Sequence, residues 1–310
     1  MARKVYSTTR LVMPLSASEK TRDSNGRGER NALSVSSGQG SKGGLRMQGC
    51  FKHSLPEKPL LTIITVVYNG VKNLEQTIQS VLTQDYDNVE YIIIDGGSSD
   101  GTIDLIKKYE DGIDYWVSEP DKGIYDAMNK GVGLATGDYV AFINADDWYE
   151  QGALSQIVNV MTSERTDFIF GNVALYENEK YARTFRPVHA PERPRRMPFG
   201  HPSLFVKRAL MEQYPFDLSY PTAADYDFVC KLLKKRLSFL YLDQNVANFR
   251  LGGISSSDTS KELFSIQKNH FGLLSAIYSY IRFSRNPFLS IWIRKIAEIK
   301  RKLFPFKDGL

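Results

Sequence analysis

The sequence predicts an α/β fold in which a mostly parallel central sheet carries helices on both faces. Short β-branched runs alternate with helical patterns from Leu60 to Ile143, which is typical of consecutive βαβ units. The chain has 310 residues, of which 42% are hydrophobic and 12% aromatic, enough for a full core. The predicted strands end in polar loops, where open α/β sheets bind their ligands.

The first half supplies four strands in a βαβαβαβ series. Each strand is a short apolar run, and each helix repeats its apolar residues at spacings of three and four. We expect the strands at residues 61–68, 89–94, 115–117 and 139–143, and the helices at 74–82, 103–106 and 124–135.

The second half is less regular and shows no internal repeat. An irregular loop rich in Pro and Arg spans residues 186–198. We expect helices at 153–161 and 225–235, a hairpin at 173–185, and strands at 168–170, 204–206, 239–241 and 246–249.

The two ends of the chain differ from its centre. Residues 1–58 are rich in Ser, Gly, Arg and Lys, so burial cannot offset their ordering entropy, and we predict a disordered basic segment. One hypothesis places the natural start at Met47. A folded domain is predicted over residues 59–260, and a helical, basic segment over 261–310. Within 281–310, an amphipathic basic helix is predicted from an apolar stripe of Leu289, Trp292, Ile293, Ile296 and Ile299. That helix either lies on an anionic membrane or packs on the domain.

The excess positive charge of the chain is concentrated at these ends. The net charge is +5, but residues 59–280 contain more Asp and Glu than Lys and Arg. An acidic central domain argues against nucleic acid as a partner, because phosphate binding needs clustered basic residues. Only Cys50 and Cys230 occur, which excludes a disulfide framework. No apolar run reaches the roughly 18 residues of a spanning helix, and no secretory signal opens the chain, so we expect a cytoplasmic protein.

Polar residues follow three of the predicted strands. Asn69, Asp95 and the pair Asp146 and Asp147 all leave the same carboxyl edge of the sheet, so we expect them to face one cleft. Adjacent carboxylates suit a hard cation such as Mg²⁺ or Mn²⁺, although a solvated turn is the alternative. The loop at residues 95–102 offers glycines and hydroxyls to a nucleotide, or it simply caps a helix.

At these residues the chain resembles the inverting glycosyltransferases of family 2, which use a nucleotide-sugar donor on a GT-A fold. The similarity covers about residues 60–255, and its motifs keep the family's order: TVVYN at 65–69, IIDGGSSDGT at 93–102 and INADD at 143–147. A further block, SEPDKGIYDAMNKG at 118–131 followed by ATGD at 135–138, resembles transferases of bacterial surface-polysaccharide assembly.

The resemblance implies a nucleotide-binding first half and an acceptor-side second half. Asp95 is expected to accept from the uracil or guanine edge, and Asp146 to bind Mn²⁺ or Mg²⁺, which stabilises the diphosphate leaving group. Asn144 stands at the position of the first Asp in the Asp-x-Asp motif with which the family binds its metal. Arg250 is assigned to the diphosphate, or is a surface arginine. The full expected donor set is Tyr68, Asn69, Asp95, Gly97, Ser98, Asp121, Lys122, Asn144, Ala145, Asp146 and Arg250.

The resemblance also implies a general base in the second half. The matching stretch is AADYDF at 223–228, where Asp225 is the candidate that takes the proton of the acceptor hydroxyl and Ala224 replaces the usual Glu. The alternative is that Asp225 caps its helix. His201 and Trp148 are assigned to the acceptor side, with an ordinary loop histidine and a packed ring as their alternatives.

The implied activity is transfer of one sugar from a UDP- or GDP-sugar to a saccharide or lipid-linked saccharide in polysaccharide biosynthesis. The chain lacks the Gln-x-x-Arg-Trp motif of processive members, which favours single-sugar transfer. Such an enzyme is expected in the cytoplasm or peripherally on the inner membrane. Two rivals remain: a catalytically silent nucleotide-sugar binding protein, favoured by Asn144 and Ala224, and a sugar nucleotidyltransferase. Donor sugar, acceptor and oligomeric state are not indicated.

Overall fold

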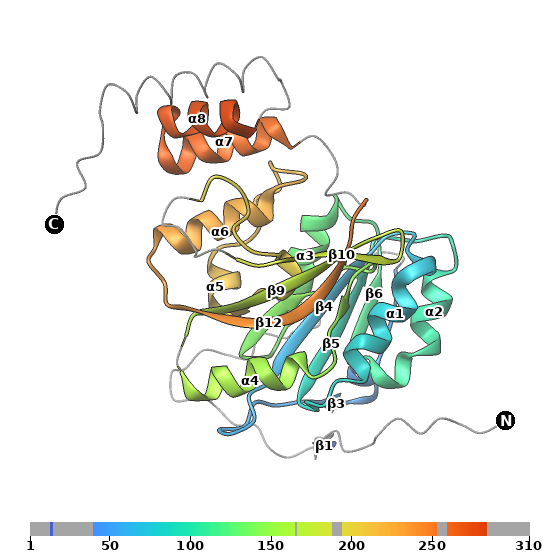
Figure 1. The fold of residues 1–310 in the computed structure, drawn as a ribbon. Helices are drawn as coiled ribbons and strands as arrows, with labels where there is room; N and C mark the ends of the chain where they lie inside the picture. Colours follow the sequence, from blue (N-terminus) through green and yellow to red (C-terminus); the bar gives the residue numbers. More distant parts are fainter. Residues whose placement is uncertain (1–12, 15–39, 165, 188–193, 253–258, 284–310) are drawn as a thin grey trace, which may run out of the picture.

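A mixed ten-stranded sheet forms the middle of the described chain (Figure 1). The structure is a computed structural model that describes residues 13–14, 40–164, 166–187, 194–252 and 259–283. Across the sheet the strands are β2 (Ser41–Gly43), β6 (Tyr115–Ser118), β5 (Val89–Asp95), β4 (Leu61–Val67), β7 (Tyr139–Phe142), β11 (Phe205–Lys207), β9 (Phe168–Glu177), β12 (Phe239–Arg250) and β8 (Trp148–Tyr149), with β10 (Lys180–Phe185) paired to β9.

The central strands β6, β5, β4 and β7 are parallel, as predicted. Every residue of β4 and β5 is buried, which explains why apolar residues dominate both strands. Val67 pairs with Asp95, so both strands end at the same level. The loops that follow β4, β5 and β7 therefore leave one edge of the sheet together.

Helices cover both faces of this sheet, which confirms the predicted fold class. Side chains alternate along β4, so Ile63 packs in one core cluster and Ile64 in the other. One cluster includes residues of α1 (Val71–Leu82), α2 (Thr102–Lys108) and α4 (Ala153–Ser163). The opposite cluster includes residues of α3 (Ile124–Leu134), α5 (Arg208–Gln213) and α6 (Ala224–Lys234).

Several elements differ in extent from the sequence prediction. β12 is one strand of 12 residues rather than two, because it runs alongside β9 through two register shifts. The short elements β8, α5, η2 (Glu110–Gly112) and η3 (His201–Ser203) had no periodic signal in the sequence.

The prediction of disorder across residues 1–58 is wrong for residues 40–58. β2 pairs antiparallel with β6 at the sheet edge, and η1 (Leu45–Gln48) and β3 (Cys50–Phe51) follow, with β1 (Met13–Pro14) paired to β3. Arg46 forms an ion pair with buried Glu90. Lys52 and Asp114 form a second, buried pair at 2.6 Å. Residues upstream of Met47 thus contribute to the fold, through backbone pairing and ion pairs that composition does not reveal. Apart from Met13 and Pro14 of β1, the rest of the predicted disordered segment lies outside the described residues.

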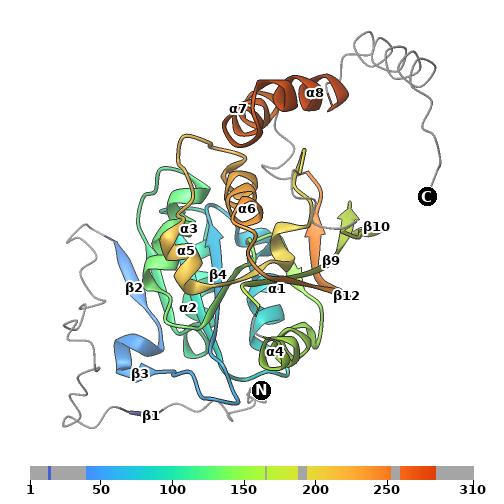
Figure 2. The ribbon, with the colours of Figure 1, turned by 90° about the vertical axis from the view of Figure 1, so that its left-hand side faces the viewer.

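The segment predicted to be helical beyond residue 260 begins with two helices, the first of which packs on the preceding residues. α7 (Ser260–Phe271) and α8 (Leu273–Phe283) form a helical pair above α6 (Figures 1 and 2). Ile266 and Gln267 of α7 are buried, and the Gln267 amide donates to Pro194 O at 2.5 Å. α7 is therefore part of the domain. The predicted amphipathic helix beyond residue 283 lies outside the described residues. None of the helices in the described ranges has the length and apolar character needed to cross a membrane.

Candidate active site

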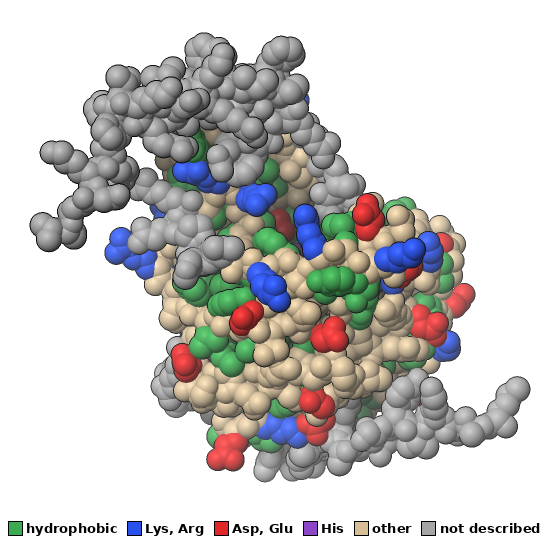
Figure 3. Space-filling model, in the orientation of Figure 1, with side chains coloured by type: hydrophobic (Ala, Val, Ile, Leu, Met, Phe, Trp, Pro, Cys, Tyr) green, Lys and Arg blue, Asp and Glu red, His purple; other side chains and the backbone are tan. Residues whose placement is uncertain are grey.

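A cavity of about 590 Å³ opens where the carboxyl ends of the central strands meet the second half of the domain. Eight residues predicted for the site line it: Tyr68, Asn69, Asp121, Asn144, Ala145, Asp146, His201 and Asp225. Six others do not: Asp95, Gly97, Ser98, Lys122, Trp148 and Arg250. On the face shown in Figure 3, acidic and basic side chains are interspersed.

The turn after β4 presents an exposed aromatic ring to this cavity. Tyr68 is 68% exposed, and Asn69 adopts a left-handed backbone with φ of 50°, which Asn tolerates better than most residues. Asn69 N–H donates to Ser98 Oγ at 2.7 Å, and its Oδ1 accepts from Ser99 N–H at 2.9 Å. The loop after β5 is thereby fastened to the end of β4.

Asp95 lies beneath this loop rather than in the cavity. It is fully buried, and its carboxylate accepts from the N–H groups of Gly97 and Ser98 at 3.1 and 2.9 Å and from Ser118 Oγ at 2.6 Å. Its second oxygen accepts from Ser98 Oγ. The expectation that Asp95 faces the cleft is therefore corrected. As the last residue of a paired strand it remains in the sheet, where it, Gly97 and Ser98 shape the loop.

Asp121 occupies the space that Gly96 leaves open. A Cβ on Gly96 would lie 2.5 Å from Asp121 Oδ2 and 3.4 Å from the Tyr68 ring. The other oxygen, Oδ1, accepts from Gly123 N–H at 2.8 Å. Lys122 is exposed. Asp121 is thus the carboxylate that stands beside Tyr68 at the cavity wall.

The loop after β7 provides the residues suited to a divalent cation. Burial raises the pKa of Asp146, and its own backbone hydrogen bond and the Arg250 charge lower it to a smaller extent. Asn144 Oδ1 is buried without a hydrogen-bond partner in the described structure. Within the described ranges no cluster of three His, Cys, Asp or Glu side chains can hold a metal. The donors present therefore fit an ion that takes most of its ligands from phosphate and water.

Asp147 fastens this loop to the end of β12. It is fully buried, and its Oδ1 accepts from Arg250 N–H at 3.1 Å. Burial and the neighbouring Asp146 raise the pKa of Asp147 well above its ordinary value. Its backbone carbonyl accepts from Thr77 Oγ1 at 2.6 Å. These contacts give Asp147 a structural place behind the cavity.

The guanidinium of Arg250 is engaged with protein groups. It donates to Asp146 O at 2.5 Å and to Glu179 at 2.9 Å, and it lies 4.5 Å from the centroid of the Trp148 ring. Trp148 also packs against Tyr176 at 4.9 Å. Neither Arg250 nor Trp148 is among the residues that line the cavity.

Asp225 reaches the cavity from the first turn of α6. Its Oδ1 accepts from the Tyr125 hydroxyl at 2.9 Å and from Tyr226 N–H at 2.8 Å. Its Oδ2 lies 3.8 Å from His201 Nδ1. Burial lowers the pKa of His201, and the Asp225 charge opposes this only in part, so the ring is neutral at pH 7.

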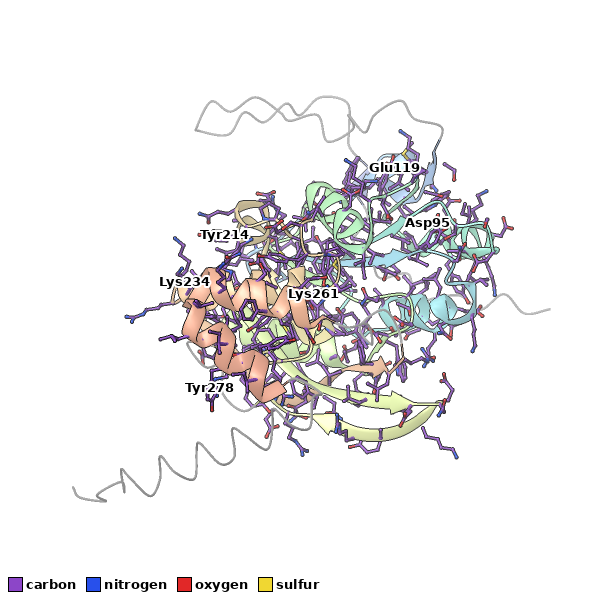
Figure 4. All side chains as sticks on the ribbon, turned by 90° about the horizontal axis from the view of Figure 1, so that it is seen from above. Asp95, Glu119, Tyr214, Lys234, Lys261 and Tyr278 are labelled. Carbon is purple, nitrogen blue, oxygen red and sulfur yellow. The ribbon has the colours of Figure 1, made fainter. Side chains whose placement is uncertain are left out.

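Asp225 is not the cap of its helix. Ala223 is the N-cap residue, and it has no side-chain acceptor. Glu262 of α7 supplies one instead: its carboxylate accepts from Thr222 N–H, Ala223 N–H and Thr222 Oγ1 at 3.0, 2.9 and 2.8 Å. Seen from above, α7 with Lys261 and α8 with Tyr278 lie to one side of Asp95 and Glu119 (Figure 4).

Sequence reasoning missed several residues of the site. No sequence pattern pointed to Glu262, because the residues that it contacts are distant in sequence. Tyr125 lies in the block at 118–131, in which the sequence analysis gave a role to Asp121 and Lys122 but not to Tyr125. Further cavity-lining residues not predicted are Lys72, Asn73, Ile124, Met128, Thr222 and Phe249.

Comparison with known proteins gives consistent matches. The family model for glycosyl transferase family 2 matches residues 62–237. An uncharacterized glycosyltransferase of Mycobacterium tuberculosis is 42% identical over 90 residues, 29% of this chain and 34% of the relative, so the match spans about a third of that protein. An uncharacterized glycosyltransferase of Haemophilus influenzae is 30% identical over 247 residues, 74% of this chain and 97% of the relative.

Two solved structures share the fold. TarS 1–349 of S. aureus, in complex with UDP-GlcNAc, superimposes with a TM-score of 0.58 at 16% identity and covers 78% of this chain and 81% of TarS 1–349. The mannosyltransferase PcManGT from Pyrobaculum calidifontis, in complex with GDP-Man and Mn²⁺, gives a TM-score of 0.50 at 17% identity, covering 82% and 84% of the two chains.

Proposed function

Because the chain belongs to glycosyl transferase family 2, we propose that it transfers one sugar, with inversion, from a UDP- or GDP-sugar to a saccharide or lipid-linked saccharide acceptor. The place of this reaction is polysaccharide biosynthesis. The observation that carries the proposal is that one cavity joins the donor-side residues Tyr68 and Asp146 to the candidate base Asp225. The structural relatives that were solved with UDP-GlcNAc and with GDP-Man and Mn²⁺ support a nucleotide-sugar donor.

The donor nucleotide is proposed to lie against Tyr68. An exposed aromatic ring at a cavity mouth offers a flat face on which a base stacks. Asp121, beside that ring, is placed to accept hydrogen bonds from the base or the ribose. This assigns to Asp121 the contact first expected of Asp95.

The diphosphate is proposed to bind through a divalent cation at Asp146 and Asn144. The unpartnered Asn144 Oδ1 supports this, because a cation is a favourable partner for a buried carbonyl oxygen. Mn²⁺ or Mg²⁺ would neutralise the negative charge that develops on the leaving diphosphate. Asp146 provides the protein's charged ligand.

Asp225 is proposed to act as the general base. The acceptor hydroxyl oxygen bonds to the anomeric carbon, the bond from that carbon to the diphosphate oxygen breaks, and the hydroxyl proton passes to Asp225. Its Oδ1 is held by the Tyr125 hydroxyl and Tyr226 N–H, whereas its Oδ2 lies 3.8 Å from His201 Nδ1. Neutral His201 leaves the negative charge of Asp225 available.

Substitution of Asp225 tests the base and separates the enzyme from a silent binding protein. Asp225→Asn keeps the shape of the side chain, so donor binding remains while the transfer rate falls about 10²- to 10⁴-fold. Asp217→Asn is the control, because Asp217 is exposed and its carboxylate accepts a local bond from Ser219 N–H. Wild-type transfer by Asp225→Asn would remove the base assignment. Donor binding without turnover in the wild type would favour the silent protein.

A panel of UDP- and GDP-sugars tests donor and cation together. We expect one nucleotide series to raise the melting temperature in the presence of Mn²⁺, and Asp146→Asn to abolish this dependence on Mn²⁺. Donor binding that is the same with Mn²⁺ and with EDTA would contradict the role proposed for the cation.

Peripheral membrane contact through residues 281–310 completes the proposal. Its support lies in α8, which leads into this segment and exposes several large apolar side chains: Leu273, Leu274, Ile277, Tyr278 and Tyr280. Residues 281–310 are rich in Lys and Arg, which favour an anionic surface. Flotation with anionic liposomes should recover the full chain and lose the chain that ends at residue 280. Equal recovery of the full chain and the shortened chain would contradict the proposed membrane contact.

A further inference from the structure

Tyr125, in the first turn of α3, makes a direct contact with the proposed base. It is 7% exposed, and its hydroxyl lies 2.9 Å from Asp225 Oδ1. Burial, followed by the charge of Asp225, raises the pKa of Tyr125 above its ordinary range. The phenol therefore stays protonated, and the direction of the bond is fixed: the hydroxyl donates and the carboxylate accepts.

The position of Tyr125 is fixed by a second anchor on the same helix. The Asn129 side chain donates to Phe216 O and accepts from Phe216 N–H, both at 2.9 Å. The Tyr125 ring packs on the Phe216 ring with 5.4 Å between centroids. Two backbone bonds and a ring contact to one residue prevent α3 from rotating away from Asp225.

The same helix is tied to the loop that carries Asp121. Lys130 pairs with Glu119 at 3.0 Å and donates to Pro120 O at 3.0 Å. Asp126 accepts from Lys122 N–H at 2.9 Å. The block at 118–131 thus connects the loop that carries Asp121 to the helix that carries Tyr125. These contacts give the motif a structural role between the proposed donor site and the proposed base.

We propose that Tyr125 is a positioning residue that holds Asp225 Oδ1 so that Oδ2 is presented to the acceptor hydroxyl. A carboxylate rotates about its Cβ–Cγ bond unless its oxygens are held. Tyr226 N–H also donates to Oδ1, but it belongs to the same helix as Asp225 and cannot fix the carboxylate relative to the donor site. Among the described residues, Tyr125 is the donor to Asp225 that comes from another element.

The charged and titratable groups that the described structure places around this pair come from two elements, η3 and α7. His201 on η3 faces Oδ2 and is neutral, and Glu262 on α7 lies near enough to affect Tyr125 electrostatically. Neither takes over the bond from Tyr125 to Oδ1. The inference rests on Asp225 being the base of the proposed reaction.

Tyr125→Phe removes the hydroxyl and keeps the ring on Phe216. We expect kcat to fall about 10- to 100-fold, because a small misplacement of a catalytic group has effects of this order. KM for the donor should stay within about twofold, since the donor contacts are untouched and the cavity remains folded. Tyr91→Phe is the matched control: Tyr91 is fully buried and its hydroxyl bonds to Thr65 Oγ1 at 3.0 Å, away from Asp225.

Combining Tyr125→Phe with Asp225→Asn separates positioning from other roles. If Tyr125 acts through Asp225, the double variant is no slower than Asp225→Asn alone. If Asp225→Asn is strongly impaired and the double variant loses the product of the two single losses in kcat, the positioning role is overturned and the base assignment remains. Wild-type kcat in Asp225→Asn would overturn the base assignment and this inference with it. An unchanged kcat in Tyr125→Phe would overturn the inference alone.

Discussion

Replacing Glu262 tests whether α7 helps to build the active site. The Glu262 carboxylate accepts from two backbone N–H groups, those of Thr222 and Ala223, at the start of the helix that carries Asp225. In Glu262→Ala both groups lose their acceptor, and a negative charge is removed from the positive end of α6. We therefore expect both stability and transfer rate to fall.

The size of the effect follows from these contacts. Loss of a helix cap costs about 0.5–2 kcal/mol, and a hydrogen bond to a charged group contributes about 1.5–3 kcal/mol. Glu262 is half-buried, so water compensates part of the loss, and we expect a change of about 2 kcal/mol in the free energy of unfolding. In a domain of this size that lowers Tm by roughly 4–8 °C. Glu262→Gln keeps an oxygen acceptor and should lose about half as much.

Thermal unfolding and kcat measure this prediction, with Glu212→Ala as control. Glu212 pairs with Arg208 at 2.6 Å on the surface of α5, and breaking such an exposed pair changes stability by less than about 1 kcal/mol. The reasoning is refuted if Glu262→Ala and Glu212→Ala melt at the same temperature. In that case α7 would pack on the domain without supporting the loop before Asp225.

Three further predictions concern pH, packing and donor choice. Burial raises the pKa of Asp227, but its bonds, above all that to His270, outweigh this and hold it below 3.8. The ionised Asp227 stabilises the fold above that value, and this effect is lost as pH falls through the folded-state pKa. Asp227→Asn should therefore be less stable than wild type in urea unfolding at pH 7, and the difference in the free energy of unfolding should narrow towards pH 3. Gly171→Ala places a Cβ 2.4 Å from Val246, so we expect a loss of about 1–3 kcal/mol, partly restored by Val246→Ala. Asp121→Asn should weaken donor binding about tenfold and alter the preference between UDP- and GDP-sugars.

The outcomes that would contradict these predictions are equally direct. If the difference in the free energy of unfolding between Asp227→Asn and wild type is constant from pH 7 to pH 3, the ion pairs of Asp227 do not stabilise the fold. An unchanged Tm in Gly171→Ala would show that β9 and β12 can separate at this point. Unaltered donor preference in Asp121→Asn would remove Asp121 from base recognition.

The fold class could be predicted because parallel strands need apolar residues on both faces. β4 and β5 are mostly apolar on both faces, and in a chain where such runs alternate with helices they are typical of a parallel sheet covered on both sides. The convergence of residues after β4 and β7 followed from the geometry of a parallel sheet. Whether a side chain at such a strand end points into the cavity depends on the pleat and the loop, and the sequence does not specify either.

Asp95 illustrates this limit. Its position after a buried strand suggested an exposed carboxylate, yet the ladder with β4 continues to Asp95 itself, and the loop turns back to donate to it. Asp146 lies beyond the last paired residue of β7 and does reach the cavity. A difference of a few residues in where pairing stops thus separates a loop-building carboxylate from a ligand-facing one.

The surroundings of Asp225 were the least predictable part of the site, because each neighbour comes from a different element. Tyr125 arrives from α3, His201 from η3 and Glu262 from α7. This bears on the substitution that favoured a silent protein, in which Ala224 stands where the family has a Glu. Ala224 is fully buried in the core, so a carboxylate at that position would need a charged or hydrogen-bonding partner there. Glu262 brings a carboxylate to the same helix end from α7, and the start of α6 therefore keeps its negative charge and its cap. The loss of the family's Glu is thus compatible with an active base, provided that α7 remains in place.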